Sequence, residues 1–165
     1  MPMIAASFAV ALATAAPPLA LRPELAPFGF LMDACWSTTF PCTRDVDTHC
    51  FSSLFGGQHV RDVHVVRGPK GVYRGETIYS WDKAAKTVRY SYYNSFGDAL
   101  HGTMRPRGAD LMFGQGEAEP SILWRRSGAD GYEVVADGRV LRFSRRLNRP
   151  VNRGEPTQDL TVNVN

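Results

Sequence analysis

The sequence lacks the patterns that assign a chemistry directly. Its formal net charge is only +3, so it has no strong basic excess of the kind that predicts a nucleic-acid partner. It contains no C-x-x-C or H-x-x-x-H pair, which argues against zinc, and we predict no metal site and no cofactor. It also has no G-x-S-x-G motif. The usual serine-nucleophile hydrolases are therefore not indicated.

Charge is absent from the first 21 residues, and the first charged side chain is that of Arg22. An apolar run in this segment is followed by Ala13-Thr14-Ala15, which has the A-x-A form of a signal-peptide cleavage site. The run is rich in alanine and meets prolines before the roughly 20 apolar residues of a membrane span accumulate. We predict cleavage near Ala15/Ala16 or Ala20, and a periplasmic or secreted mature chain with no transmembrane segment.

Amphipathic helices are also missing, because no segment shows a convincing helical periodicity. Short aromatic and β-branched runs alternate instead with turn signals, at a spacing of about 8–12 residues that is typical of antiparallel β proteins. The uniformly short connections favour an up-and-down meander over a Greek key. Closure into a barrel would leave this meander without exposed edges. The predicted fold class is therefore all-β, an antiparallel up-and-down β-barrel of about ten strands.

The predicted boundaries follow from these patterns. The chain would comprise a signal peptide (1–21), a linker (22–29), one barrel domain (30–146) and a loosely ordered polar tail (147–165). The predicted strands cover residues 30–40, 46–55, 58–67, 72–82, 86–95, 98–105, 109–114, 119–127, 131–137 and 138–146.

Cysteine is scarce, with three residues in the whole chain. Export would allow a disulfide to form. A hairpin with its turn centred on Cys42-Thr43 places Cys35 directly opposite Cys50, at the Cα separation of about 4.5–5.5 Å that a disulfide can bridge. We predict a disulfide between Cys35 and Cys50 and a free Cys42 near the loop tip. Three reduced thiols are the alternative.

Tyrosine is abundant between Tyr73 and Asn94. With a hairpin turn at residues 83–86, strict alternation gives one face of aromatic and hydroxyl groups and one charged face. The charged face should meet water and the aromatic face the barrel interior. Two-residue turns at 69–70 and 96–97 extend this interior onto the neighbouring strands. The predicted ligand-binding residues are Asp62, His64, Thr77, Tyr79, Trp81, Tyr90, Tyr92, Asn94 and His101.

So many polar groups in one interior indicate a cavity. Each buried hydroxyl, imidazole or carboxyl without a hydrogen-bond partner costs roughly 1–3 kcal/mol, which water or a ligand in a cavity would remove. Barrels of this size can enclose one small ligand. A packed core with tyrosine hydroxyls at the rim is one alternative. A bulged turn at 68–72 is another, and it would place Arg61 inside in place of Asp62 and His64.

The segment DACWSTTF (33–40), ahead of an antiparallel meander, resembles the first strand of lipocalin-like (calycin) barrels. That strand typically carries G-x-W, which Ala34-Cys35-Trp36 matches with alanine in place of glycine. The run GETIYSWD…VRYSYYNSFG is also similar to small bacterial members of this superfamily. The resemblance implies a cavity for a small, often hydrophobic ligand. It also implies that a late arginine, Arg142, Arg145 or Arg146, covers Trp36 through a cation–π contact.

Haem is not implied by this resemblance. The haem-binding members of the superfamily carry an iron-ligating histidine late in the chain, and no histidine follows His101 here.

Three functions are compatible with these features. The favoured one is a binding protein that holds an amphipathic or hydrophobic small molecule in the barrel. The second is a cofactor-independent enzyme of the lyase or isomerase type, whose candidate catalytic residues are Asp62, His64 and His101, with a tyrosine as an alternative acid. The third is an envelope-interaction protein whose arginine-rich segment, residues 139–153, makes weak contact with anionic surfaces.

Overall fold

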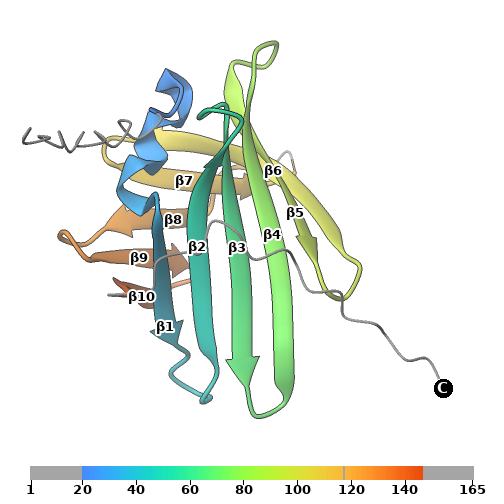
Figure 1. Cartoon of the computed structure of the whole chain (residues 1–165), viewed down its shortest axis with the longest axis vertical. Helices are drawn as coiled ribbons and strands as arrows, with labels where there is room; N and C mark the ends of the chain where they lie inside the picture. The colour runs from blue at the N-terminus through green and yellow to red at the C-terminus, as the bar shows by residue number, and fades with distance from the viewer. Residues whose placement is uncertain (1–19, 117, 147–165) are drawn as a thin grey trace, which may run out of the picture.

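Ten strands pair in chain order, and the first closes against the last (Figure 1). This architecture is seen in a computed structural model that describes residues 20–116 and 118–146. Every neighbouring pair of strands is antiparallel. The predicted all-β, up-and-down barrel is therefore confirmed.

Each observed strand overlaps one of the predicted runs. The strands are β1 (Ala34–Thr39), β2 (Val46–Leu54), β3 (His59–Gly68), β4 (Gly71–Asp82), β5 (Thr87–Asn94), β6 (Ala99–Arg107), β7 (Asp110–Gln115), β8 (Ile122–Arg126), β9 (Gly131–Ala136) and β10 (Arg139–Arg145). In Figure 1 the β1–β2 and β3–β4 turns lie at one end of the barrel and the β4–β5 turn at the other.

The region predicted as a linker is structured. Residues 22–29 belong mostly to a 3-10 helix, η1 (Pro23–Leu31), whose Leu25, Phe28 and Leu31 are completely buried. η1 contacts β3, β4 and β7, and it lies across the end of the barrel where the β4–β5 hairpin turns (Figure 1). The linker prediction is therefore wrong, because the apolar residues of PELAPFGFL enter the barrel core.

Two hairpins have the predicted register. Gly68 pairs with Gly71 across a two-residue turn between β3 and β4, and Tyr79 pairs with Tyr90 across β4 and β5. Arg61 lies on the outer face, where its guanidinium donates hydrogen bonds of 3.0 and 2.8 Å to the two carboxylate oxygens of Glu76. The alternative register with Arg61 inside is therefore not adopted.

The β5–β6 register differs from the prediction by one residue. A two-residue turn at 96–97 was expected, whereas the structure has a three-residue loop at 95–97, in which Gly97 has a φ of 89°. The Asn94 side-chain oxygen accepts hydrogen bonds from the backbone N–H groups of Phe96 (2.9 Å) and Asp98 (3.1 Å). A glycine with positive φ at the third position is typical of such loops. The extra residue reverses which side chains of β6 face inward.

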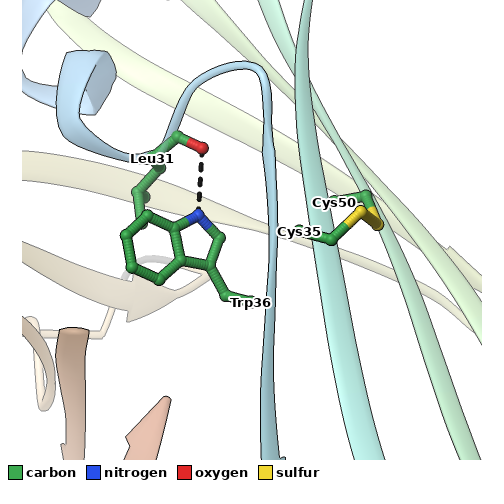
Figure 2. The surroundings of a disulfide bond; sticks show 4 residues. All are labelled: Leu31, Cys35, Trp36 and Cys50. Atoms are coloured by element: carbon green, nitrogen blue, oxygen red, sulfur yellow. Dashed lines mark hydrogen bonds between the residues drawn. A yellow bond between two sulfur atoms is a disulfide. The ribbon is translucent and has the colours of Figure 1, made fainter. Parts of the chain in front are cut away.

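The first hairpin carries the predicted disulfide. Cys35 and Cys50 are cross-strand partners of β1 and β2 and are joined by a disulfide, with Cα atoms 4.0 Å apart. Cys42 is free and exposed in the connecting loop. Figure 2 shows the disulfide and the Trp36 ring on opposite sides of β1. Alternation along β1 therefore separates the outward disulfide from the inward tryptophan.

Trp36 is completely buried, and its indole N–H donates a hydrogen bond of 3.1 Å to the carbonyl oxygen of Leu31 at the end of η1 (Figure 2). The Arg145 guanidinium lies 5.2 Å from the centre of the Trp36 ring. Arg142 instead donates a hydrogen bond of 3.0 Å to Glu133 on the outer face. Of the arginines implied as covers, Arg145 thus occupies the position over Trp36.

The predicted polar tail, and the predicted signal peptide apart from Ala20 and Leu21, lie outside the described residues. The helical part of residues 20–116 and 118–146 contains no apolar segment of membrane-spanning length.

Candidate functional site

A cavity of about 210 Å³ lies inside the barrel against strands β4 to β8. Its lining residues are Thr77, Tyr79, Tyr90, Tyr92, Leu100, Phe113, Gln115, Ile122 and Trp124. Aromatic rings dominate the walls, and the polar groups are hydroxyls and one amide. Apolar walls with a few placed polar groups are the usual composition of a small-molecule site.

Two glycines create the space that the tyrosine rings occupy. A Cβ atom on Gly75 of β4 would lie only 2.6 Å from the hydroxyl of Tyr92. A Cβ on Gly102, the cross-strand partner of Tyr90, would overlap the carbonyl oxygen of Gly114 and crowd the Tyr90 ring. The rings therefore lie against neighbouring backbone and leave the centre of the barrel open on this side.

The cavity hydroxyls are neutral hydrogen-bonding groups. Burial raises the pKa of Tyr79 well above its usual value, and the nearby Asp62 carboxylate raises it further. Burial raises the pKa of Tyr90, and burial together with a hydrogen bond to Tyr73 raises that of Tyr92. Because a raised pKa keeps a phenol protonated near neutral pH, these groups can donate to and accept from a ligand but are poor bases.

Four of the predicted ligand-binding residues line this cavity: Thr77, Tyr79, Tyr90 and Tyr92. Trp81 points to a second hollow, of about 450 Å³, that it shares with Glu24 and Met104 near η1. Alternation along a strand predicts which side chains face inward, but it does not predict which of the two hollows each side chain lines.

His101 and Asn94 do not contribute to the cavity. His101 is exposed on the outer face of β6, with its Nδ1 atom 3.2 Å from the hydroxyl of Ser91. Asn94 keeps the predicted register opposite Gly75, but its amide donates a hydrogen bond of 3.0 Å to Asp98 within the loop. The prediction that His101 faces the interior is wrong, because the three-residue β5–β6 loop reverses the faces of β6.

A cluster of four ionisable side chains lies beside the cavity, on the inner face of β2 and β3. We call Asp47, His49, Asp62 and His64 the Asp–His cluster. His49 Nδ1 lies 2.7 Å from Asp62 Oδ2, and its Nε2 lies 3.5 Å from Asp47 Oδ2. His64 Nε2 lies 2.8 Å from Asp47 Oδ1. Both carboxylates are buried, and the two imidazole rings stack with centroids 4.2 Å apart.

The two carboxylates determine the charge state of the cluster. Burial alone would lower the pKa of His49, but the charge of Asp62 and hydrogen bonds to Asp47 and Asp62 outweigh burial and raise it to about 10. Burial alone would raise the pKa of Asp47, but the His49 and His64 imidazoles close to its two oxygens lower it to about 2. His49 is therefore a cation held between two acids near neutral pH.

The Asp62–His64 pair proposed from the sequence does not form, since the imidazole that Asp62 contacts is that of His49. His64 contacts Asp47, and the edge of its ring meets Tyr73. None of the four cluster residues belongs to the lining of the cavity. Trp124 lines the cavity, and the centroid of its ring lies 6.0 Å from that of the His49 ring. The cluster therefore adjoins the cavity without forming part of its wall.

Sequence reasoning missed Asp47 and His49, although a usable signal was present. The Cys35–Cys50 pairing also places His49 opposite the inward-facing Trp36. Asp47, two residues before His49, must lie on the same face of its strand. Applying alternation to this hairpin as well as to the tyrosine-rich one would have identified both residues.

The chain matches no known protein-family model, and no curated protein is significantly similar to it in sequence. The geometry of the cavity and of the Asp–His cluster is therefore the basis for assigning a function.

Proposed function

We propose that the protein is an exported binding protein, with a lipocalin-like barrel that holds one small, uncharged amphipathic molecule. The observation that carries this proposal is the aromatic cavity of about 210 Å³ with neutral hydroxyls in its walls. Pockets for drug-sized ligands measure roughly 300–1,000 Å³. A cavity below that range fits a molecule of about one or two rings.

The polarity of the lining restricts the ligand further. The cavity is lined by residues without formal charge, and burying an unpaired charge there would be strongly unfavourable. Tyr79, Tyr90 and Phe113 offer ring faces and edges, with ring centroids 6.0–6.3 Å apart, for aromatic contacts. The hydroxyls of Thr77 and the tyrosines can orient a single polar group. A phenol or an indole has this combination of properties.

Two further features support export and the lipocalin-like assignment. The Cys35–Cys50 disulfide is typical of oxidising compartments and agrees with the A-x-A sequence ahead of the barrel. The buried Trp36 of the first strand, with Arg145 of the last strand over its ring, has the arrangement that the A-x-W resemblance implies.

The two other functions have less support. The proposed enzyme paired Asp62 with His64 and used His101 or a tyrosine as the acid, whereas Asp62 contacts His49 and His101 lies outside. The envelope-binding segment includes Arg142 and Arg145, which lie 3.0 and 3.9 Å from the acids Glu133 and Asp130. These contacts reduce the free positive charge on the described part of that segment.

Binding of p-cresol and indole, followed by ligand-observed NMR, tests the proposal. The unmodified chain should bind at least one of these probes, and Ile122→Trp should abolish binding by filling the cavity. Val140→Trp is the matched control, because Val140 is 40% exposed on β10 and should leave binding unchanged. No binding of any neutral one- or two-ring probe, or equal binding by the Ile122→Trp variant, would contradict the proposal.

A further inference from the structure

We propose that Asp47, His49 and His64 form a binding site for one divalent transition-metal ion, with Zn²⁺ as the first ion to test. The absence of C-x-x-C and H-x-x-x-H spacings, which argued against zinc, concerns ligands along one segment. These three ligands come from two strands. His49 and His64 are direct cross-strand partners, and Asp47 precedes His49 by two residues on the same face.

The distances between the donor atoms suit a shared ion. One ligand atom from each of the three side chains can be chosen so that all lie within 4.8 Å of one another. Ligand atoms around a tetrahedral zinc ion, with bonds of about 2.0–2.2 Å, lie about 3.3–3.6 Å apart. His49 Nε2 lies 3.5 Å from Asp47 Oδ2, within that range, and His64 Nε2 lies 2.8 Å from the other oxygen, Oδ1, so a shared ion would lie between the two imidazoles and this carboxylate after a small expansion.

Asp62 orients His49 for this role, and zinc bound at Nε2 would replace the proton that this nitrogen carries in the metal-free chain. The Asp62 carboxylate lies 2.7 Å from His49 Nδ1, which fixes the ring and directs the opposite nitrogen, Nε2, toward Asp47. Metal-binding histidines almost always use their second ring nitrogen in this way, with a carboxylate or carbonyl as the partner. The buried position of Asp62, at 1% exposure, makes the contact inaccessible to competing solvent.

Within the part of the chain that the structure describes, three buried atoms of the cluster, Asp47 Oδ1, Asp62 Oδ1 and His64 Nε2, are left without an aligned hydrogen bond. Asp47 Oδ1 and His64 Nε2 are both buried and only 2.8 Å apart, yet neither has a properly oriented hydrogen-bond partner within residues 20–116 and 118–146. Two lone pairs at this distance repel each other unless a proton or a cation lies between them. A metal ion bound by both would satisfy each atom.

The donor set indicates the class of ion. Two imidazole nitrogens and one carboxylate form a common three-ligand set for zinc, and they also suit other first-row divalent ions. Calcium and magnesium prefer sites built from oxygen atoms alone. Three protein ligands leave at least one coordination position for water or another small ligand.

Zinc titration by calorimetry tests the site, in a Cys42→Ser background that removes the exposed thiol as a competing ligand. The metal-free chain should bind one Zn²⁺ ion. His64→Asn and His49→Asn should each weaken binding by at least about tenfold, and Asp62→Asn by about 10–100-fold. His59→Asn is the matched control, because His59 contacts Ser80 at 2.7 Å outside the cluster and should leave the affinity unchanged.

Histidine side-chain NMR of the chain with all four histidines intact provides a test that does not depend on whether a variant folds. Added Zn²⁺ should shift the Nε2 resonances of His49 and His64 and leave those of His59 and His101 in place. The proposal is overturned if no stoichiometric binding occurs, if folded His64→Asn binds zinc as tightly as the parent, or if the resonances of His59 or His101 move instead. The first outcome would identify the cluster as a network of ion pairs alone.

Discussion

At the scale of single residues, the phenol groups of the interior have an energetic consequence at high pH. Tyr79 and Tyr132 are almost fully buried, and burial together with the nearby acids raises the pKa of both well above the usual value. A group whose pKa is higher in the folded chain contributes stability that is complete below its unfolded pKa, which is about 10 for tyrosine. That contribution is lost as the pH rises further.

We therefore expect cooperative alkaline unfolding that begins above about pH 10. The tyrosinate absorbance of the buried phenols should appear together with the loss of the β-sheet circular dichroism signal, because these groups can ionise only when the barrel opens. Tyr79→Phe should move the unfolding midpoint to higher pH by removing one such group. Ionisation of all six tyrosines in a barrel that stays folded would contradict this account.

At the scale of elements, β1 is held unequally on its two sides. It pairs with β2 through six residue pairs and a disulfide, but with β10 through only the pairs of Trp36 with Arg145 and Ser37 with Ser144. The β1–β10 seam therefore has the fewest paired residues of the closed sheet, and fixing β1 to β2 limits the freedom of the edge that must close it.

Removing the disulfide should lower stability without changing the fold. The bridge spans a sequence separation of 15 residues, for which the loss of unfolded-state entropy corresponds to about 3 kcal/mol. The double variant Cys35→Ser/Cys50→Ser should reduce the free energy of unfolding by about 2–4 kcal/mol in urea titrations. Cys42→Ser should have no effect, and an equal loss in that control would indicate a different pairing.

The two glycines beside the cavity should respond differently to substitution. Gly102→Ala places a Cβ against the backbone of Gly114, so β6 and β7 must shift, at an expected cost of about 1–3 kcal/mol. Gly75→Ala meets only the end of the Tyr92 side chain, which can move. We expect the smaller loss of stability for Gly75→Ala but weaker binding of p-cresol. Equal destabilisation of the two variants in urea titrations would contradict this interpretation.

Strand positions and two of the registers along the tyrosine-rich part of the chain were predictable because alternation and short turns are local properties. The β5–β6 register was not, since Asn94 and Gly97 convert a two-residue turn into a three-residue loop through side-chain hydrogen bonds. The helix η1 was missed for a different reason. Its apolar residues have no regular period and become ordered only through contacts with the barrel.

At the scale of the whole molecule, the cavity ends where η1 enters the barrel. η1 enters the barrel beside the second hollow, at the end near the β4–β5 turn, and the centroid of its Phe28 ring lies 4.6 Å from that of Tyr79 and 6.5 Å from that of Phe113, both of which line the cavity. Phe28 therefore forms the floor beneath the cavity wall, and the helix before the barrel helps to set the depth of the ligand site.

Phe28→Ala should deepen the cavity. We expect it to lower the free energy of unfolding by about 3–5 kcal/mol, as truncation of a fully buried phenylalanine does. The space created is apolar, so benzene should bind the variant and restore part of its thermal stability, as apolar cavities of engineered proteins allow. Phe30→Ala is the control. Phe30 is only partly buried, whereas Phe28 is completely buried, and the Phe30 ring packs on Tyr132, which does not line the cavity. It should cost less and gain no response to benzene. If Phe28→Ala were no more destabilising than Phe30→Ala, η1 would not be the floor of the site, and the ligand cavity would have to be defined by the strands alone.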